Sequence, residues 1–257
     1  MAEDNEKTVD TNDDEGRMSF LEHLEEFRWR IIKSAIGVVI GSIICGIFVN
    51  WIMNYFLLAP AKSTNPPLVL INLKPYGQLV LYMEVILVGG IIVSIPNIFY
   101  QFWKFIQPGL LPGERSYIWW IVFFTSFCFI GGAAFSYFII LPTALKFFAS
   151  FGTESITNNI AVNEYFSFIL SVMITSGIVF ELPMVSYFLS RLGLLTPAFM
   201  KKYRRHAIVV TLIVAGIVTP GPDITSQVLL SLPLFLLYEI SIVISRFAQK
   251  QRIKTEE

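Results

Sequence analysis

Residues Ile31–Leu58 read IIKSAIGVVIGSIICGIFVNWIMNYFLL and carry a single charged residue, Lys33. A helix needs roughly 20 mostly apolar residues to cross a hydrocarbon layer about 30 Å thick. This run meets that length, and Ala59 and Pro60 close it. A charge at the bilayer centre costs at least ~2.5 kcal/mol. A stretch with a single charge near one end therefore predicts a transmembrane helix.

The same pattern recurs along the chain. The chain is 54% hydrophobic and 15% charged, whereas soluble domains carry about 25% charged residues. We therefore predict an all-α, polytopic membrane domain over residues 18–247 with six spans. They cover about residues 31–58, 78–106, 117–141 (before Pro142), 165–189, 207–218 and 224–244. The fifth span is only about 18 Å long, and with the sixth it predicts a helical hairpin.

Basic residues fix the predicted orientation. Loops on one side of a six-span arrangement hold only Lys62, Lys74 and Lys146. The segments on the other side, which include both termini, hold far more lysine and arginine, and cytoplasmic segments carry this excess. Both termini are therefore predicted to be cytoplasmic. The basic residues on that side include Arg28, Arg30, Lys33, Lys104, Arg115, Arg191, Lys201, Lys202, Arg204, Arg205, Arg246, Lys250, Arg252 and Lys254.

The segments outside the spans are short. Residues 1–17 are polar and acidic, which predicts a disordered tail. Residues 19–30 predict a short amphipathic helix on the cytoplasmic surface, with Ser19 and Glu22 forming a capping box. Residues 248–257 are predicted to be a cytoplasmic tail.

Several classes of function are disfavoured by what the sequence lacks. The formal net charge is zero, so no attraction to nucleic acid is expected. Neither a GxxxxGK[ST] phosphate loop nor a GxSxG nucleophile motif occurs. Cys45 and Cys128 lie within apolar runs, and His23 and His206 have no metal-ligand spacing around them. We expect no enzymatic activity, no cofactor and no metal, and a role in binding or transport.

Two cytoplasmic acidic residues are candidates for a binding site. Glu26 lies in the helix before the first span, and it is either part of a site or a local i,i+4 partner of Arg30. Glu114 lies in the proline-stiffened loop after the second span. It is either part of a site or a helix N-terminal carboxylate in a surface turn.

Further acidic residues lie within or beyond the spans. Glu181 falls inside the fourth apolar run, two residues before Pro183. An intramembrane carboxylate is a functional-site hypothesis, and the alternative is a protonated carboxyl bonded to a neighbouring helix. Asp223 lies in the outer turn with Gln227 one helical turn later, and its alternative role is a helix cap. Glu84 and Glu239, near span ends, are interpreted as helix-end pairing or snorkelling residues.

Five pieces, in order along the chain, resemble the TatC family, the core membrane component of the twin-arginine protein translocase. The resemblance runs from Phe20 to Phe247. The pieces are FLEHLEEFRWR (20–30), YQFWKFIQPGL (100–110) leading to Glu114-Arg115, FELP (180–183), TPGPD (219–223) with Ser226-Gln227, and YEI (238–240) with SRF (245–247).

The resemblance implies a concave, glove-like bundle in the bacterial cytoplasmic membrane. Its cytoplasmic site would receive the paired arginines of a folded cargo protein's signal peptide. Glu26 and Glu114 match the acidic residues of that site, and Arg28 and Phe105 match positions that support it. A planar, permanently charged guanidinium suits such carboxylates.

The resemblance also implies residues for the transport step and partners. Glu181 matches a residue that lines the intramembrane groove. Asp223 and Gln227 match outer-side positions important for transport, and Pro60 matches a proline at the outer end of the first span. The implied partners are small single-span TatA/TatB-type subunits and further copies of the chain, with the proton-motive force driving export.

The sequence departs from the family pattern at four positions. Phe27 stands where leucine is usual, Trp29 where a basic residue is common, and Pro112-Gly113 where some relatives have more polar residues. Two other classes of function stay open. One is a small-molecule or ion transporter that uses Glu181 and Asp223 as a proton path, and the other is a membrane enzyme.

Overall fold

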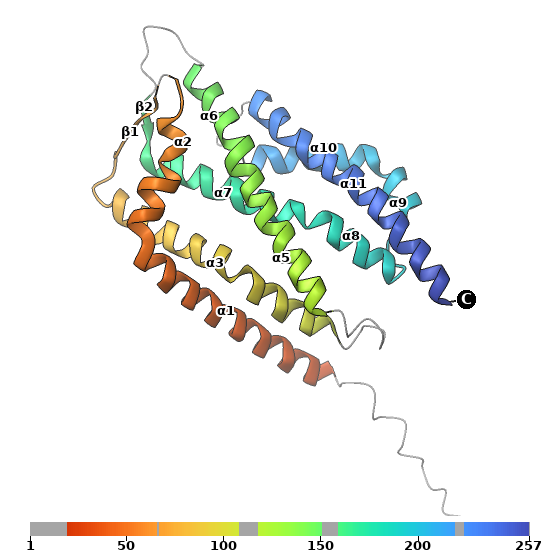
Figure 1. Cartoon of the computed structure of the whole chain (residues 1–257). Coiled ribbons are helices and arrows are strands. Elements are labelled where there is room, and N and C mark those ends of the chain that lie inside the picture. Colours follow the sequence, from red (N-terminus) through yellow and green to blue (C-terminus); the bar gives the residue numbers. More distant parts are fainter. Residues whose placement is uncertain (1–19, 66, 108–117, 151–158, 219–223, 257) are drawn as a thin grey trace, which may run out of the picture.

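The computed structural model describes residues 20–65, 67–107, 118–150, 159–218 and 224–256, which are almost entirely helical (Figure 1). The elements, in chain order, are α1 (Phe20–Trp51), a π-helical turn (Ile52–Leu57), α2 (Ala59–Lys62), β1 (Val69–Ile71), α3 (Gly77–Ile106), α5 (Ile118–Phe135), a second π-helical turn (Ser136–Ile140), α6 (Leu141–Ser150), β2 (Asn159–Ala161), α7 (Val162–Phe180), α8 (Leu182–Arg191), α9 (Pro197–Lys202), α10 (Arg204–Val218) and α11 (Ile224–Glu256).

Five of the described helical segments are long and apolar enough to cross a membrane, which agrees with the predicted polytopic helical fold. They are Glu22–Lys62, Gly77–Ile106, Ile118–Ala149, Val162–Arg191 and Ser231–Lys250. The predicted fifth span corresponds to α10, whose 15 residues reach only about 22 Å. The count of six therefore stays a prediction.

The helix predicted before the first span and the span itself form one element. Residues 19–30 were expected to form a short amphipathic helix that runs into the first span, and α1 continues without a break from Phe20 to Trp51. No glycine or proline lies between Phe20 and Ile36 to interrupt it. An i,i+4 ion pair between Glu26 and Arg30 crosses the expected boundary, with Nη2 and Oε1 2.7 Å apart, and such pairs stabilise helices.

Two other helices are longer than predicted. The third span was expected to end before Pro142, but helix continues to Ser150. Because proline lacks an N–H and its ring clashes with the carbonyl four residues back, the wider π-helical turn just before Pro142 lets the helix proceed. The last helix extends to Glu256 rather than residue 244, so the predicted tail is largely helical. Residues 245–256 contain no glycine or proline.

Three local features complete the fold. The fourth span is divided at Glu181 into α7 and α8, as expected for a helix that contains Pro183. Thr196 caps the short helix α9 by accepting a hydrogen bond from the Phe199 amide, at 3.2 Å. Strands β1 and β2 form a small parallel pair in which Val69 lies opposite Asn159.

Small residues allow α1 and α3 to lie side by side (Figure 1). A Cβ atom added to Gly41 would lie 2.6 Å from the carbonyl oxygen of Gly90, so only glycine fits this crossing. Ser94 of α3 donates a 2.7 Å hydrogen bond to the Gly37 carbonyl of α1. Close backbone approach at small residues is a common way of packing helices in membranes.

Candidate functional site

Glu26 lies on α1, and one of its carboxylate oxygens accepts hydrogen bonds while the other has no donor among the described residues. Arg30, one turn later, donates to Glu26 Oε1 from Nη2 at 2.7 Å and from Nε at 3.3 Å. Both side chains are largely buried, with exposed fractions of 16% for Arg30 and 19% for Glu26. Glu26 Oε2 is also buried, and no described residue donates a hydrogen bond to it. One acceptor position of this carboxylate is therefore unused by the described residues.

Gln101 of α3 joins this pair from the second helix. Arg30 Nη1 donates to Gln101 Oε1 at 3.2 Å, so the guanidinium bridges α1 and α3. Pairing of Arg30 with Glu26 was predicted from the sequence, whereas Gln101 was not singled out. Gln101 could have been noticed in the sequence because it is an uncharged polar residue near the end of an apolar run, inside the segment 100–110 that resembles the family.

Phe105 holds the end of α3 against α1. Its ring stacks on the His23 ring, with the two ring centroids 4.4 Å apart. The centroid of the Phe27 ring lies 5.2 Å from that of Phe105. His23, Glu26, Phe27 and Arg30 follow an i, i+3, i+4, i+7 spacing, so they share one face of α1. The structure therefore brings Phe105 to the face that carries Glu26.

Arg28 is not part of this cluster. It lies on a different face of α1, its side chain is exposed, and it makes no ion pair with a described residue. Glu114 and Asp223 lie outside the described residues, so their distances from the other site residues stay predictions.

Pro60 and Gln227 both belong to well-packed regions. Pro60 is buried in the first turn of α2. The Tyr165 hydroxyl donates to the Leu57 carbonyl at 2.8 Å and accepts from the Ala61 amide at 3.1 Å, which ties this end of the first helix to α7. Gln227 Nε2 donates to the Leu212 carbonyl at 2.7 Å and so connects α11 to α10.

Glu181 occupies the junction between α7 and α8. Its side chain is buried, with an exposed fraction of 8%, and no described residue hydrogen-bonds its Oε1 atom. Pro183 and Met184 line a largely apolar hollow of about 390 Å³, together with Cys128 and Phe124 of α5. Glu181 is thus enclosed two residues before the part of α8 that lines this hollow, and its Oε1 atom has no partner among the described residues.

The two remaining acidic residues considered in the sequence have partners. Arg204 Nη2 donates to Glu239 at 2.7 Å, so Glu239 of α11 pairs with the start of α10. Glu84 of α3 accepts a 2.8 Å hydrogen bond from the Ser167 hydroxyl of α7. Within the described ranges, no group of three or more His, Cys, Asp or Glu residues could hold a metal ion.

Comparison with known proteins gives the same family throughout. The family model described as Sec-independent protein translocase protein (TatC) matches residues 22–233. The protein of that name from Carboxydothermus hydrogenoformans is 38% identical over 239 residues, covering 93% of this chain and 97% of its own. The one from Aquifex aeolicus is 37% identical, covering 91% and 98%.

A solved structure agrees with these relatives. A crystal structure of a protein described as the twin arginine translocase receptor TatC superposes with a TM-score of 0.81 and 38% sequence identity. It covers 88% of this chain and 99% of its own. The residues that form the site lie within the matched range, and a family model that covers most of the chain is decisive. The chain therefore belongs to the TatC family of Sec-independent protein translocase proteins.

Proposed function

We propose that this protein is the signal-peptide receptor of a twin-arginine translocase and binds the paired arginines of folded cargo proteins through Glu26 and Glu114. The observation that carries the proposal is the Glu26 carboxylate, one buried oxygen of which has no donor among the described residues. The comparison protein described as a twin arginine translocase receptor supports the same role.

The chemistry of arginine explains why two carboxylates would be needed. A guanidinium is a planar fork of donors that pairs strongly with a carboxylate. Arg30 already occupies Oε1 of Glu26, so a single incoming guanidinium can bind at Oε2. The second arginine of the peptide needs another acceptor, and Glu114 is the carboxylate that the family resemblance assigns to it.

Phe105 and Arg28 have supporting roles in this proposal. Phe105 keeps the end of α3 against the α1 face that carries Glu26. The exposed Arg28 contributes to the cytoplasmic surface around the site. Both chain termini are cytoplasmic in this arrangement, six helices cross the bacterial cytoplasmic membrane, and the chain acts without a cofactor or an enzymatic step.

The transport step is assigned to different residues. The enclosed Glu181 attracts water or polar groups into the membrane, since a buried polar oxygen without a partner is costly. Asp223, Gln227 and Pro60 act on the outer side. The partners are small single-span TatA/TatB-type subunits and further copies of this chain, and the proton-motive force drives export.

Crosslinking in membranes tests the receptor assignment. A twin-arginine signal peptide is expected to crosslink to the wild-type protein, and a peptide with both arginines changed to lysine is not. Glu26→Ala and Glu114→Ala are expected to lose the crosslink while inserting normally. The matched control is Glu25→Ala, because Glu25 is exposed on the same helix. Crosslinking that persists both with the lysine peptide and in the two alanine variants would refute the assignment and favour the transporter alternative.

A further inference from the structure

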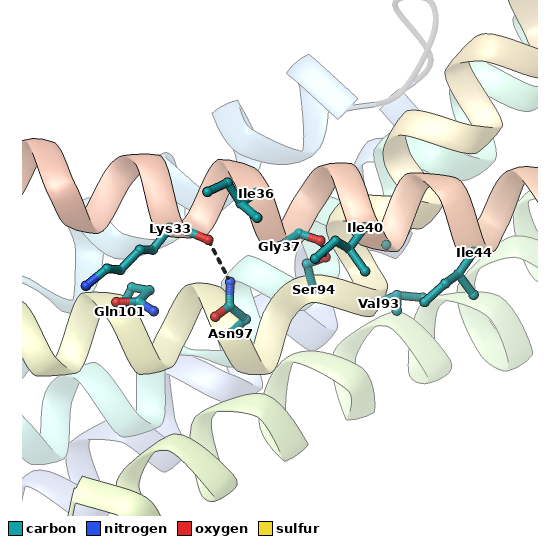
Figure 2. Close-up of a pocket in the computed structure, with 10 residues that line it drawn as sticks. Lys33, Ile36, Gly37, Ile40, Ile44, Val93, Ser94, Asn97 and Gln101 are labelled. Atoms are coloured by element: carbon teal, nitrogen blue, oxygen red, sulfur yellow. Dashed lines mark hydrogen bonds between the residues drawn. The ribbon is translucent and has the colours of Figure 1, made fainter.

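A hollow of about 440 Å³ lies between α1 and α3, beside the Glu26 cluster, with which it shares Gln101. Figure 2 shows Lys33 and Gln101 at one end of it and Ile44 and Val93 at the other. Gly37 and Gly41 form its floor on α1, and Ser94 and Asn97 line it on α3. We infer that this hollow binds one anionic phospholipid, with the headgroup at Lys33 and an acyl chain along the two helices.

The polar end of the hollow has donors that suit a phosphate. Among the described residues, no carboxylate pairs with the exposed Lys33. Gln101 accepts from Arg30 through Oε1, which leaves its amide N–H groups available. Asn97 Nδ2 donates to the Lys33 carbonyl at 3.3 Å (Figure 2) and so holds the two helices together at this end. Basic pockets between membrane helices on the cytoplasmic side bind anionic headgroups.

The other end of the hollow suits an acyl chain. Ile36, Ile40 and Ile44 form an i,i+4 ridge along it, and each is at least 44% exposed. Beyond Ile44 and Val93 the surface continues into a second hollow of about 430 Å³, lined by Cys45, Phe48, Trp51 and Ile52. A surface that is cationic at one end and apolar along its length matches an amphiphile.

The dimensions also match a lipid of one leaflet. The α1 segment from Lys33 to Ile44 rises about 16 Å, which is close to half of a hydrocarbon core about 30 Å thick. The hollow holds a volume equal to only about 15 water molecules. A helix about 10 Å across does not fit within so small a volume, whereas a single acyl chain is narrow enough to lie along it. A lipid is therefore the better occupant than a single-span partner.

Binding of lipid here would place a negative headgroup next to the Arg30–Gln101 contact. Lys33 follows Arg30 by less than one helical turn, and Gln101 lines the hollow while it bonds Arg30. The bound phosphate would help to hold Gln101 in place. This inference does not depend on signal-peptide binding, because its test measures lipid alone.

Native mass spectrometry of the purified protein tests the inference. In neutral detergent with added phosphatidylglycerol, one tightly retained lipid is expected, and phosphatidylcholine should not replace it. Lys33→Gln is expected to weaken retention about fivefold, the change that corresponds to one lysine near an anionic surface. Lys250→Gln is the matched control, because Lys250 is exposed on α11, far from this hollow.

A second pair of variants tests the chain-binding part. Val93→Trp fills the hollow and should reduce retention, whereas Val39→Trp adds the same ring at an exposed position of α1 that does not line it. Equal retention in all four variants would overturn the inference. Displacement of the lipid by water-soluble glycerol phosphate would also overturn it, since that shows a phosphate site. The inference would also be overturned if Ile40 crosslinked to a single-span subunit in membranes that lack the anionic phospholipid.

Discussion

At the scale of single residues, the central feature is the Glu26 carboxylate, which binds an internal guanidinium through one oxygen while the other oxygen has no donor among the described residues. Arg30 holds one oxygen of Glu26 and reaches Gln101 across the helix interface. Its presence orients the Glu26 side chain before any ligand arrives, which lowers the ordering cost of binding. The sequence showed Glu26 and Arg30 at helical spacing, but it could not show the contact with Gln101, which lies 71 positions away.

A prediction at this scale concerns Gln101. Gln101→Leu removes the acceptor that anchors Arg30 to α3, so Glu26 should be held less firmly. We expect signal-peptide affinity to fall roughly tenfold, which corresponds to the ~1.5 kcal/mol of a hydrogen bond to a charged group, with normal folding. The measurement is titration of a fluorescent twin-arginine peptide. Gln78→Leu, at the exposed far end of α3, is the control, and an equal loss there would contradict the role.

At the scale of helices, glycine decides how closely the elements pack. Gly41 meets the Gly90 backbone, and Gly132 of α5 would place a Cβ atom 2.6 Å from the Ser176 carbonyl of α7. Gly131, by contrast, faces open space. The sequence alone shows these glycines as equivalent small residues, because only the crossing geometry tells which of them face a partner helix.

This difference gives a prediction with a built-in control. Gly41→Ala should destabilise the protein by roughly 1–3 kcal/mol, the usual cost of overpacking, because backbone atoms of α3 must move. Gly131→Ala should be neutral or stabilising, since alanine is the better helix former by about 1 kcal/mol. Thermal unfolding of the two variants in detergent measures the difference. Equal melting temperatures would show that α1 and α3 are not packed as closely as described.

The helices and strands also show which features could be predicted from the sequence and which could not. Long apolar runs predicted the positions of the long helices closely, because hydrophobic length is a strong local signal. For example, α3 covers Gly77–Ile106, and the predicted span was 78–106. Proline was a weaker guide: at Pro142 a π-helical turn let the helix continue, whereas at Pro183 the helix divided. The parallel pairing of Val69 with Asn159 depends on tertiary proximity and leaves no local pattern.

At the scale of the whole molecule, binding and transport are assigned to separate places. The Glu26 cluster lies near the start of α1, whereas Glu181 is enclosed at the α7–α8 junction. No ion pair or hydrogen bond among the described residues joins these two places directly. A change at one should therefore leave the other largely intact.

A prediction follows for Glu181. Glu181→Ala should reduce export of a folded cargo several-fold while signal-peptide affinity stays near wild type, because the variant removes a polar group that attracts water into the membrane. Export assays and peptide titration on the same preparation separate the two effects. Glu164→Ala, at the exposed start of α7, should change neither quantity. Full export by the Glu181 variant would reject the role.

The most direct test of the central claim is a double-mutant cycle between Glu26 and the peptide arginines. Peptide affinity is measured for wild type and Glu26→Ala, each with the twin-arginine peptide and with peptides that carry glutamine at one arginine. Direct pairing predicts that one arginine substitution and Glu26→Ala are strongly non-additive, with a coupling of about 0.5–3 kcal/mol. Additive effects at both arginines would show that Glu26 does not contact the peptide and would contradict the account.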